Sequence, residues 1–360
     1  MQPAPTRIEP VFRERIWGAR SLAPLYPDKT DLPQPIGEVW LTAFDCPITS
    51  GPYQGKFLGA AWREMPEAWR GSAMARVPEF PILVKFIFPA DKLSIQVHPD
   101  DAYASANEQA AGGRGKTEMW HAVSAEPGAK VLIGLKAGTA REDFLKALAL
   151  RTLESLFEEH PVNVGDTFFI PPGTPHAIGP GMVLCEIQEY SDLTYRVYDY
   201  GRVDAHGNPR ELHIEKALHV TDFAKTAIGA RVLKSRNEVA GAHQAAHHLG
   251  GQSNNLLAAC SFFSAERRDF SATADFRSDP ARFDVLTVLK GKGQITWQTQ
   301  RSAYGSGESW LIPATLGSYS LQSDAATSVI HSTVPDLNEL RSAMERKGMA
   351  PQEIAGVLFS

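Results

Sequence analysis

Three separated segments of the chain carry side chains that could hold one metal ion together. Gln96 and His98 lie two residues apart in an alternating stretch. Side chains two apart on a strand share a face, so both could point at the same ion. Glu118 offers a carboxylate further along, and the loop that begins at Gly165 ends in the imidazole of His176. Imidazole and carboxylate groups are common zinc ligands, so the pattern indicates a divalent metal site.

Strands must bring these segments together. Apolar or alternating stretches predict strands at residues 82–88, 92–98, 119–123, 130–136, 166–170 and 182–190. Residues 139–159 break this pattern, because a capping-box motif at Thr139–Glu142 precedes apolar residues at helical spacing. We therefore expect a mostly β fold, in which a barrel surrounds the ion and one or two short helices are inserted between strands.

The second half of the chain repeats part of the first. Gly307 to Pro313 has the spacing of Gly165 to Pro171, but Ser318 stands where the first copy ends in His176. We predict two domains: residues 1–235, with the metal site and the inserted helices, and residues 236–360, a second barrel without a metal site. Residues 235–255, with His243, His247 and His248, are expected to be a solvated linker or loop. Two unrelated strand–turn segments remain the alternative explanation of the repeat.

Composition sets further bounds. The chain has 360 residues, 43% apolar and 21% charged, with a net charge of -5 and no basic run. These values are normal for a soluble globular protein and argue against a nucleic-acid or membrane-surface protein. The three cysteines form no Cys-x-x-Cys pair, and the N-terminus lacks an apolar leader. A cysteine zinc site is therefore not expected, and a reducing cytoplasmic setting is.

The spacing of the last segment resembles a known family. Gly165, Pro171, Gly173 and His176 match the second conserved motif of the cupin superfamily, and Gln96-Val97-His98 with Glu118 stands in place of the first. Glutamine in place of the usual first histidine is typical of phosphomannose isomerases. The chain resembles the shorter bacterial form of that family, which has two cupin-type (jelly-roll) barrels. The resemblance is carried by Trp17-Gly18, Gly37–Trp40, Leu93–Asp101, Gly115–Trp120, Gly165–His176 and Ser191–Arg196.

The resemblance implies a single zinc per chain and an isomerase. Zinc would be held by Gln96, His98, Glu118 and His176. The reaction would interconvert mannose 6-phosphate and fructose 6-phosphate through an enediolate. The partner would then be a hexose 6-phosphate, with no nucleic acid or membrane involved. The chain would be a monomer or a weak homo-oligomer.

The same resemblance suggests roles for five further residues. Arg196 is the expected cation beside the developing negative oxygen, because it ends the family's Asp-x-x-x-Arg segment. Lys116 shares a strand face with Glu118 and could bind phosphate or help to move the proton. Asp192 could orient Arg196 or take part in proton transfer. Ser94 and, more weakly, Lys136 are candidate substrate-binding residues. The sequence leaves the general base open.

Three other functions remain to be weighed. An iron or manganese cupin dioxygenase would favour a site of three histidines and a glutamate, and Gln96 speaks against it. A non-enzymatic sugar-binding cupin would not need Arg196 or the metal ligands, and this chain has both. A cupin-type glucose-6-phosphate isomerase shares the chemistry and differs in the epimer that it accepts.

Overall fold

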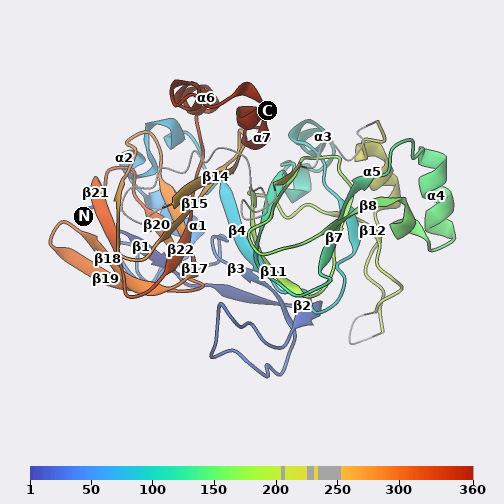
Figure 1. Ribbon diagram of the computed structural model, residues 1–360, viewed down its shortest axis with the longest axis horizontal. Coiled ribbons are helices and arrows are strands. Elements are labelled where there is room, and N and C mark those ends of the chain that lie inside the picture. The colour runs from blue at the N-terminus through green and yellow to red at the C-terminus, as the bar shows by residue number, and fades with distance from the viewer. Residues whose placement is uncertain (204–206, 225–230, 234–252, 360) are drawn as a thin grey trace.

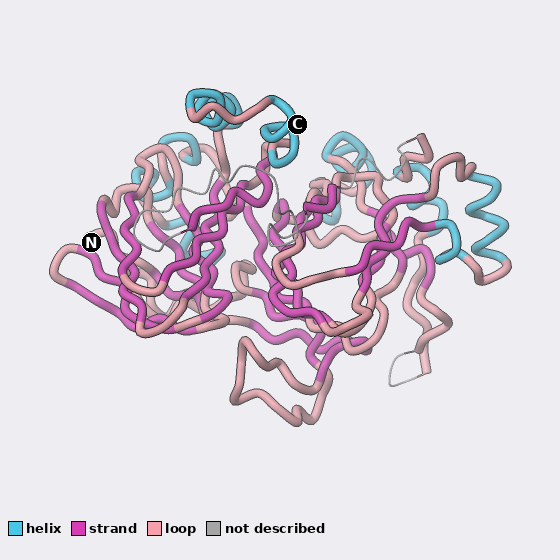
Figure 2. The backbone as a smooth tube through the Cα atoms, in the orientation of Figure 1, coloured by secondary structure: helices cyan, strands magenta, loops and turns pink. Residues whose placement is uncertain are grey.

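The computed structural model describes residues 1–203, 207–224, 231–233 and 253–359. Its strands form two units that lie side by side (Figure 1). Each unit is built from two sheets of antiparallel strands, the arrangement of a double-sheet jelly roll. The mostly β class and the two jelly-roll units are confirmed, but the sheets do not close into continuous barrels. Helices lie around the strands rather than between the sheets (Figure 2).

The first unit contains the predicted metal ligands. Its larger sheet has the order β13 (Arg231–Leu233), β9 (Thr167–Ile170), β6 (Glu118–Ala125), β11 (Met182–Glu189), β4 (Ile82–Ile87), β3 (Ile36–Trp40) and β2 (Val11–Ala19). Its smaller sheet has the order β12 (Tyr195–Tyr198), β5 (Ile95–Val97), β10 (His176–Ile178), β7 (Lys130–Leu135) and β8 (Phe157–Pro161). Apolar side chains from both sheets, such as Trp120, Ile133 and Phe168, fill the space between them. The site is therefore built inside a packed sandwich.

The second unit has the same two-layer plan. One sheet has the order β1 (Thr6–Ile8), β20 (Ser309–Ile312), β17 (Asp284–Lys290), β22 (Thr327–Thr333), β15 (Ser264–Phe270) and β14 (Ser253–Ala259). The other has the order β16 (Thr273–Arg277), β21 (Ser318–Ser323), β18 (Lys292–Trp297) and β19 (Gln300–Gly305). Strand β1 comes from the N-terminal end of the chain, so the N-terminus completes a sheet of the second unit.

The repeated motif forms the same backbone structure in both units. The Gly165 N–H donates to the Ala122 carbonyl at 2.8 Å, and the Gly307 N–H donates to the Val288 carbonyl at 2.8 Å. Both glycines have positive φ, 89° and 80°, a conformation that a side chain would strain. The predicted boundary between residues 235 and 236 lies outside the described residues, as do His243, His247 and His248. That boundary stays a prediction.

Short helices pack against the outside of the sheets. They are α1 (Leu58–Glu64), α2 (Glu67–Arg70), η1 (Ser72–Met74), α3 (Asp101–Asn107), η2 (Gln109–Ala111), α4 (Arg141–Ala149), η3 (Leu153–Leu156), α5 (Ile214–Val220), α6 (Leu337–Arg346) and α7 (Pro351–Val357). Helices α4 and η3 confirm the insertion expected at residues 139–159. No helix in the described part of the chain is both long and apolar enough to cross a membrane.

Two local predictions need correction. Helix α4 begins one residue later than the capping-box motif implied, because Ala140 is its N-cap and Asp143, not Glu142, accepts the Ala140 N–H at 3.1 Å. The Thr139 hydroxyl instead donates to the Lys136 carbonyl. The strand expected at residues 92–98 is reduced to β5, and Leu93 packs inside the sandwich with Trp120.

One apolar core joins the two units. It contains Trp62 and Phe80 from the first half of the chain together with Phe283 from the second, and their rings lie 5.0 to 5.2 Å apart. Burial of aromatic side chains is among the largest stabilising contributions available to a fold. We infer that the second unit stabilises the first through this shared core.

Candidate metal centre and active site

His98, Glu118 and His176 come together inside the first unit. One ligand atom from each lies within 4.8 Å of the others, and all three residues are buried. Glu118 begins β6, His176 begins β10, and His98 follows β5 directly. The Glu118 Oε1 atom is 3.3 Å from His176 Nε2, and Oε2 is 3.7 Å from His98 Nε2. The fold thus gathers one carboxylate and two imidazoles from three distant segments.

Both imidazoles are held in the form that a metal requires. The Nδ1 atom of His98 lies 2.9 Å from the Leu193 carbonyl, and that of His176 lies 2.9 Å from the Thr174 carbonyl. Because a carbonyl can only accept, Nδ1 carries the proton in each ring and Nε2 keeps a lone pair. Burial lowers the pKa of His176 to about 4, and burial together with Lys116 lowers the pKa of His98. Both rings are therefore neutral near pH 7.

The surroundings of Glu118 fit a bound cation. Its Oε1 atom is buried without a hydrogen-bond partner and faces the His176 Nε2 lone pair, so two acceptors meet at 3.3 Å. A cation between them would remove this conflict. Burial raises the pKa of Glu118 to about 7 while the nearby Lys116 ammonium opposes this rise. Gln96 also reaches the site, since its amide Nε2 lies 3.2 Å from His176 Nε2.

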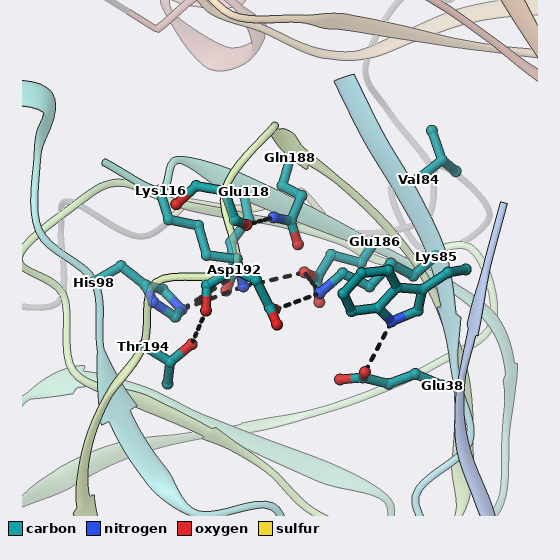
Figure 3. Close-up of polar contacts among 12 residues, drawn as sticks. Glu38, Val84, Lys85, His98, Lys116, Glu118, Glu186, Gln188, Asp192 and Thr194 are labelled. Atoms are coloured by element: carbon teal, nitrogen blue, oxygen red, sulfur yellow. Dashed lines mark hydrogen bonds and ion pairs between the residues drawn. The ribbon is translucent and has the colours of Figure 1, made fainter. Parts of the chain in front are cut away.

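A chain of buried charges runs from the metal ligands across the larger sheet (Figure 3). Lys116 Nζ lies 2.5 Å from Glu118 Oε2 and 3.2 Å from Glu186 Oε1, which lies 3.3 Å from Lys85 Nζ. Although burial acts in the opposite direction, Lys116 and Lys85 lower the pKa of Glu186 to about 2. The two carboxylates likewise raise the pKa of Lys116 despite its burial. All four groups are therefore charged when a metal keeps Glu118 ionised.

Sequence reasoning missed Lys85 and Glu186. Lys85 is the charged residue in the apolar run 82–88, and Glu186 is the charged residue in the run 182–187. Strand pairing places the two directly opposite each other on β4 and β11. A charge inside a run otherwise typical of a buried strand was the available signal, because such a charge needs a partner.

Arg196 lies in the same row of side chains as two predicted ligands. Arg196 on β12 pairs with Gln96 on β5, which pairs with His176 on β10. Directly opposite residues point to the same face of a sheet, so Arg196 faces the interior of the sandwich. Its guanidinium donates from Nη1 to the Glu211 carbonyl at 3.0 Å. Arg196 therefore lies on the same face of the sheet as Gln96 and His176, with its guanidinium bonded to the segment beyond the sheet edge.

Asp192 lies beside Lys85 rather than in an ion pair with Arg196. Its Oδ1 atom is 3.7 Å from Lys85 Nζ, and its side chain is 58% exposed. Figure 3 places Asp192 between His98 and the Lys85–Glu186 pair. Asp192 is therefore a carboxylate that lies next to the buried charges and is also open to solvent.

Ser94 and Lys136 have different surroundings. Ser94 is buried, 3% exposed, just before β5. Lys136 is exposed, and its Nζ donates to the Ser155 carbonyl of the inserted helical segment at 2.8 Å. The structure therefore leaves Lys136 engaged with the insertion and does not group it with the buried charges.

The fold and the site together define a class of protein: a double jelly roll that holds, among its described residues, a His–Glu–His cluster suited to a metal. Family models then match two parts of the chain. Residues 6–125 match the catalytic domain of type I phosphomannose isomerase, and residues 253–332 match the cupin domain of mannose-6-phosphate isomerase.

Individual proteins agree with the family models. A mannose-6-phosphate isomerase of Streptococcus mutans is 32% identical over 333 residues, which cover 91% of this chain and 98% of that protein. One from Bacillus subtilis is 31% identical over 337 residues, 92% of this chain and all of the relative. A crystal structure of mannose 6-phosphate isomerase from Bacillus subtilis superimposes with a TM-score of 0.79 at 28% identity, covering 92% of this chain and 99% of that one. The chain belongs to the mannose-6-phosphate isomerase family.

Proposed function

We propose that this protein interconverts mannose 6-phosphate and fructose 6-phosphate at a single zinc ion. Membership of the isomerase family supports the substrate class. The observation that carries the metal assignment is the buried cluster in which Glu118 Oε1 lacks a partner and faces the lone pair of His176. Two imidazoles, a carboxylate and an amide suit zinc, which needs no thiolate here.

The residues that would hold zinc are His98, Glu118 and His176, with Gln96 beside them. When bound, zinc supplies Lewis-acid polarisation of the sugar oxygens and a fixed template. The Leu193 and Thr174 carbonyls orient the two imidazoles for this role. Such outer contacts fix the ligand geometry before the metal arrives.

The remaining charged groups suit proton transfer between adjacent carbons. The isomerisation removes the proton on carbon 2 of mannose 6-phosphate and returns a proton to carbon 1 through an enediolate. Lys116 is protonated between Glu118 and Glu186, so we assign it as a proton donor rather than as a base. Asp192 is the carboxylate of this group that is open to solvent, and we assign it as the proton acceptor.

Arg196 and Ser94 complete the proposal. The interior-facing guanidinium of Arg196 would stabilise the negative oxygen of the enediolate, because a protonated Arg can contact two oxygens at once. Ser94 would contact the phosphate. Lys136 keeps its predicted role as a weaker substrate contact, and its bond to the Ser155 carbonyl gives that role no support. The cytoplasmic setting and the monomeric or weakly oligomeric state stay predictions.

The test is a coupled assay of mannose 6-phosphate conversion on purified protein before and after chelation. We expect activity to disappear on chelation, to return with zinc, and to be lost in His98→Ala. His219→Ala is the matched control, since His219 is an exposed histidine on α5. Glucose 6-phosphate as the better substrate would replace the proposed epimer, and hexose-phosphate binding without turnover under any metal would contradict an isomerase.

A further inference from the structure

The segment from Glu211 to His213 forms hydrogen bonds with Arg196 along the open edge of its sheet. Strand β12 is the edge strand, so one side of its backbone has no strand neighbour. On that side the Arg196 N–H donates to His213 Nδ1 at 3.2 Å, and the His213 N–H donates to the Arg196 carbonyl at 2.7 Å. The Arg196 side chain also donates to the Glu211 carbonyl at 3.0 Å. Three contacts from one short segment thus fix the backbone and the guanidinium of a single residue.

The backbone next to Arg196 is irregular, so the regular strand pairing alone does not fix the position of this residue. Arg196 pairs with Gln96, but Tyr198 pairs with Ile95, so the register shifts between them. Such bulges twist a strand and redirect its side chains. Edge backbone groups also need partners when they are partly buried. His213 supplies an acceptor and a donor at the position where a neighbouring strand would otherwise supply them.

We infer that His213 is the positioning residue for Arg196: its neutral imidazole accepts the Arg196 N–H at Nδ1 and so fixes the backbone that sets on which face of the sheet the Arg196 side chain lies. This inference rests on the proposed role of Arg196. The imidazole must carry its proton on Nε2, because the same Nδ1 atom cannot accept a hydrogen bond while it is protonated.

The surroundings of His213 favour this neutral form. Burial, followed by the positive charges of Arg196 and Lys216, lowers the pKa of His213, while Glu211 and Glu108 oppose the shift. The Glu211 carboxylate is 3.8 Å from His213 Nε2, and Glu108 is engaged with Lys216. Protonation would place two N–H groups against each other. We therefore expect the hydrogen bond from the Arg196 N–H to His213 Nδ1 to weaken only at acidic pH.

The experiment compares His213→Ala with His213→Asn in the zinc-loaded enzyme. Asparagine places its Oδ1 atom close to the position of Nδ1 and cannot be protonated there. We expect His213→Ala to lower kcat by about tenfold, because a partly buried N–H loses its acceptor, and to change KM little. We expect His213→Asn to keep most of kcat, with His219→Ala on helix α5, which begins directly after His213, as the control. Unchanged kcat in His213→Ala, or equal losses in both variants at wild-type thermal stability, would overturn the inference.

A double-mutant cycle separates this inference from the proposed function. If His213 acts through Arg196, His213→Ala should cost nothing further in an Arg196→Ala background. Independent, multiplicative losses would overturn the positioning role and leave the role of Arg196 intact. Full activity of Arg196→Ala alone would instead overturn the proposed cation, whatever the His213 variants do.

A pH profile gives a readout that a purely structural role would not move. Below pH 6.5 we expect the ratio of kcat for His213→Asn to that of the wild type to rise, since only the wild-type imidazole can be protonated. A ratio that stays constant down to the lowest pH at which both proteins remain folded would contradict the acceptor role of Nδ1.

Discussion

Each unit has a buried carboxylate at the corresponding position of its corresponding sheet, but different groups surround the two carboxylates. Glu118 in the first unit lies opposite Ile170, and Asp284 in the second lies opposite Ile312. The repeated glycine turns show that these positions correspond. The second unit pairs Asp284 with His331 at 3.0 Å, whereas the first leaves Glu118 Oε1 without a partner.

This difference shows what separates a structural charge from a functional one. His331 lies opposite Leu286, where the first unit has Glu186 opposite Trp120. A buried carboxylate with its own imidazole partner is already compensated and needs nothing from solution. In the first unit Lys116 pairs with Glu118 Oε2, but the imidazole of His176 presents a lone pair to Oε1, so a further cation at that oxygen would have to come from outside the chain. The carboxylate oxygen that faces a lone pair instead of a proton marks the candidate metal site.

The largest expected effect comes from making the first unit resemble the second. His176→Ser introduces the residue type that Ser318 contributes at the corresponding place. We expect the isomerase kcat/KM to fall by about a thousandfold or more, because Lewis-acid stabilisation is worth several kcal/mol. Metal content per chain, measured by mass spectrometry, should fall with it. A variant without metal that keeps the wild-type rate would contradict a metal-dependent reaction at His176.

The next largest effect concerns Glu186, the residue of the first unit that corresponds to His331 of the second. Glu186→Gln removes the negative charge between Lys85 and Lys116, both nearly fully buried. We expect the free energy of unfolding to fall by about 3–5 kcal/mol, since a buried ammonium loses its partner. Urea unfolding measures this. The double variant Lys85→Met/Glu186→Gln should recover part of the loss, and no recovery would contradict the pairing.

These two residues also show where sequence reasoning stopped. The spacing of Gln96, His98, Glu118 and His176 predicted a convergent site because strand alternation and a known motif fix where such side chains point. Lys85 and Glu186 lie in apolar runs, and only the strand register between β4 and β11 places them together. Lys136 shows a different limit, because the sequence could not reveal that its Nζ donates to the Ser155 carbonyl of a neighbouring segment; its role in substrate binding stays a prediction.

Helix boundaries were limited by a different physical cause. Helix α3 was not predicted, although Asp100 caps it by accepting the Tyr103 N–H at 2.7 Å. Its seven residues are too few to show a helical apolar period. At α4, the predicted Thr139–Glu142 motif placed the cap one residue too early, because acidic residues stand at both 142 and 143 and only the contact of Asp143 with Ala140 decides between them.

A smaller effect should appear in the second unit as a pH dependence of stability. Asp284 raises the pKa of His331 against the effect of burial. The ion pair therefore contributes fully below pH 6.5, the ordinary pKa of histidine, and its contribution is lost as pH rises through the higher folded-state pKa. We expect His331→Asn to cost about 1.5–3 kcal/mol at pH 5.5 and less at pH 9. A cost that grows with pH would contradict the ion pair.

The smallest effect is expected from the reverse substitution. Ser318→His adds an imidazole to the second unit, but Ser318 is exposed and Asp284 is already bound to His331. We expect no additional metal and a stability change within about 0.5 kcal/mol. Metal analysis of the variant after zinc loading checks this. A second equivalent of zinc would show that the second unit lacks only one ligand.

The most direct test of the account is a zinc titration of the metal-free enzyme in which bound zinc and mannose 6-phosphate turnover are followed in the same samples. We expect turnover to rise in proportion to bound zinc, to stop rising at one ion per chain, and to be absent from His98→Ala but normal in His331→Asn. Full turnover before any metal is added, or a loss of bound zinc in His331→Asn with none in His98→Ala, would contradict it.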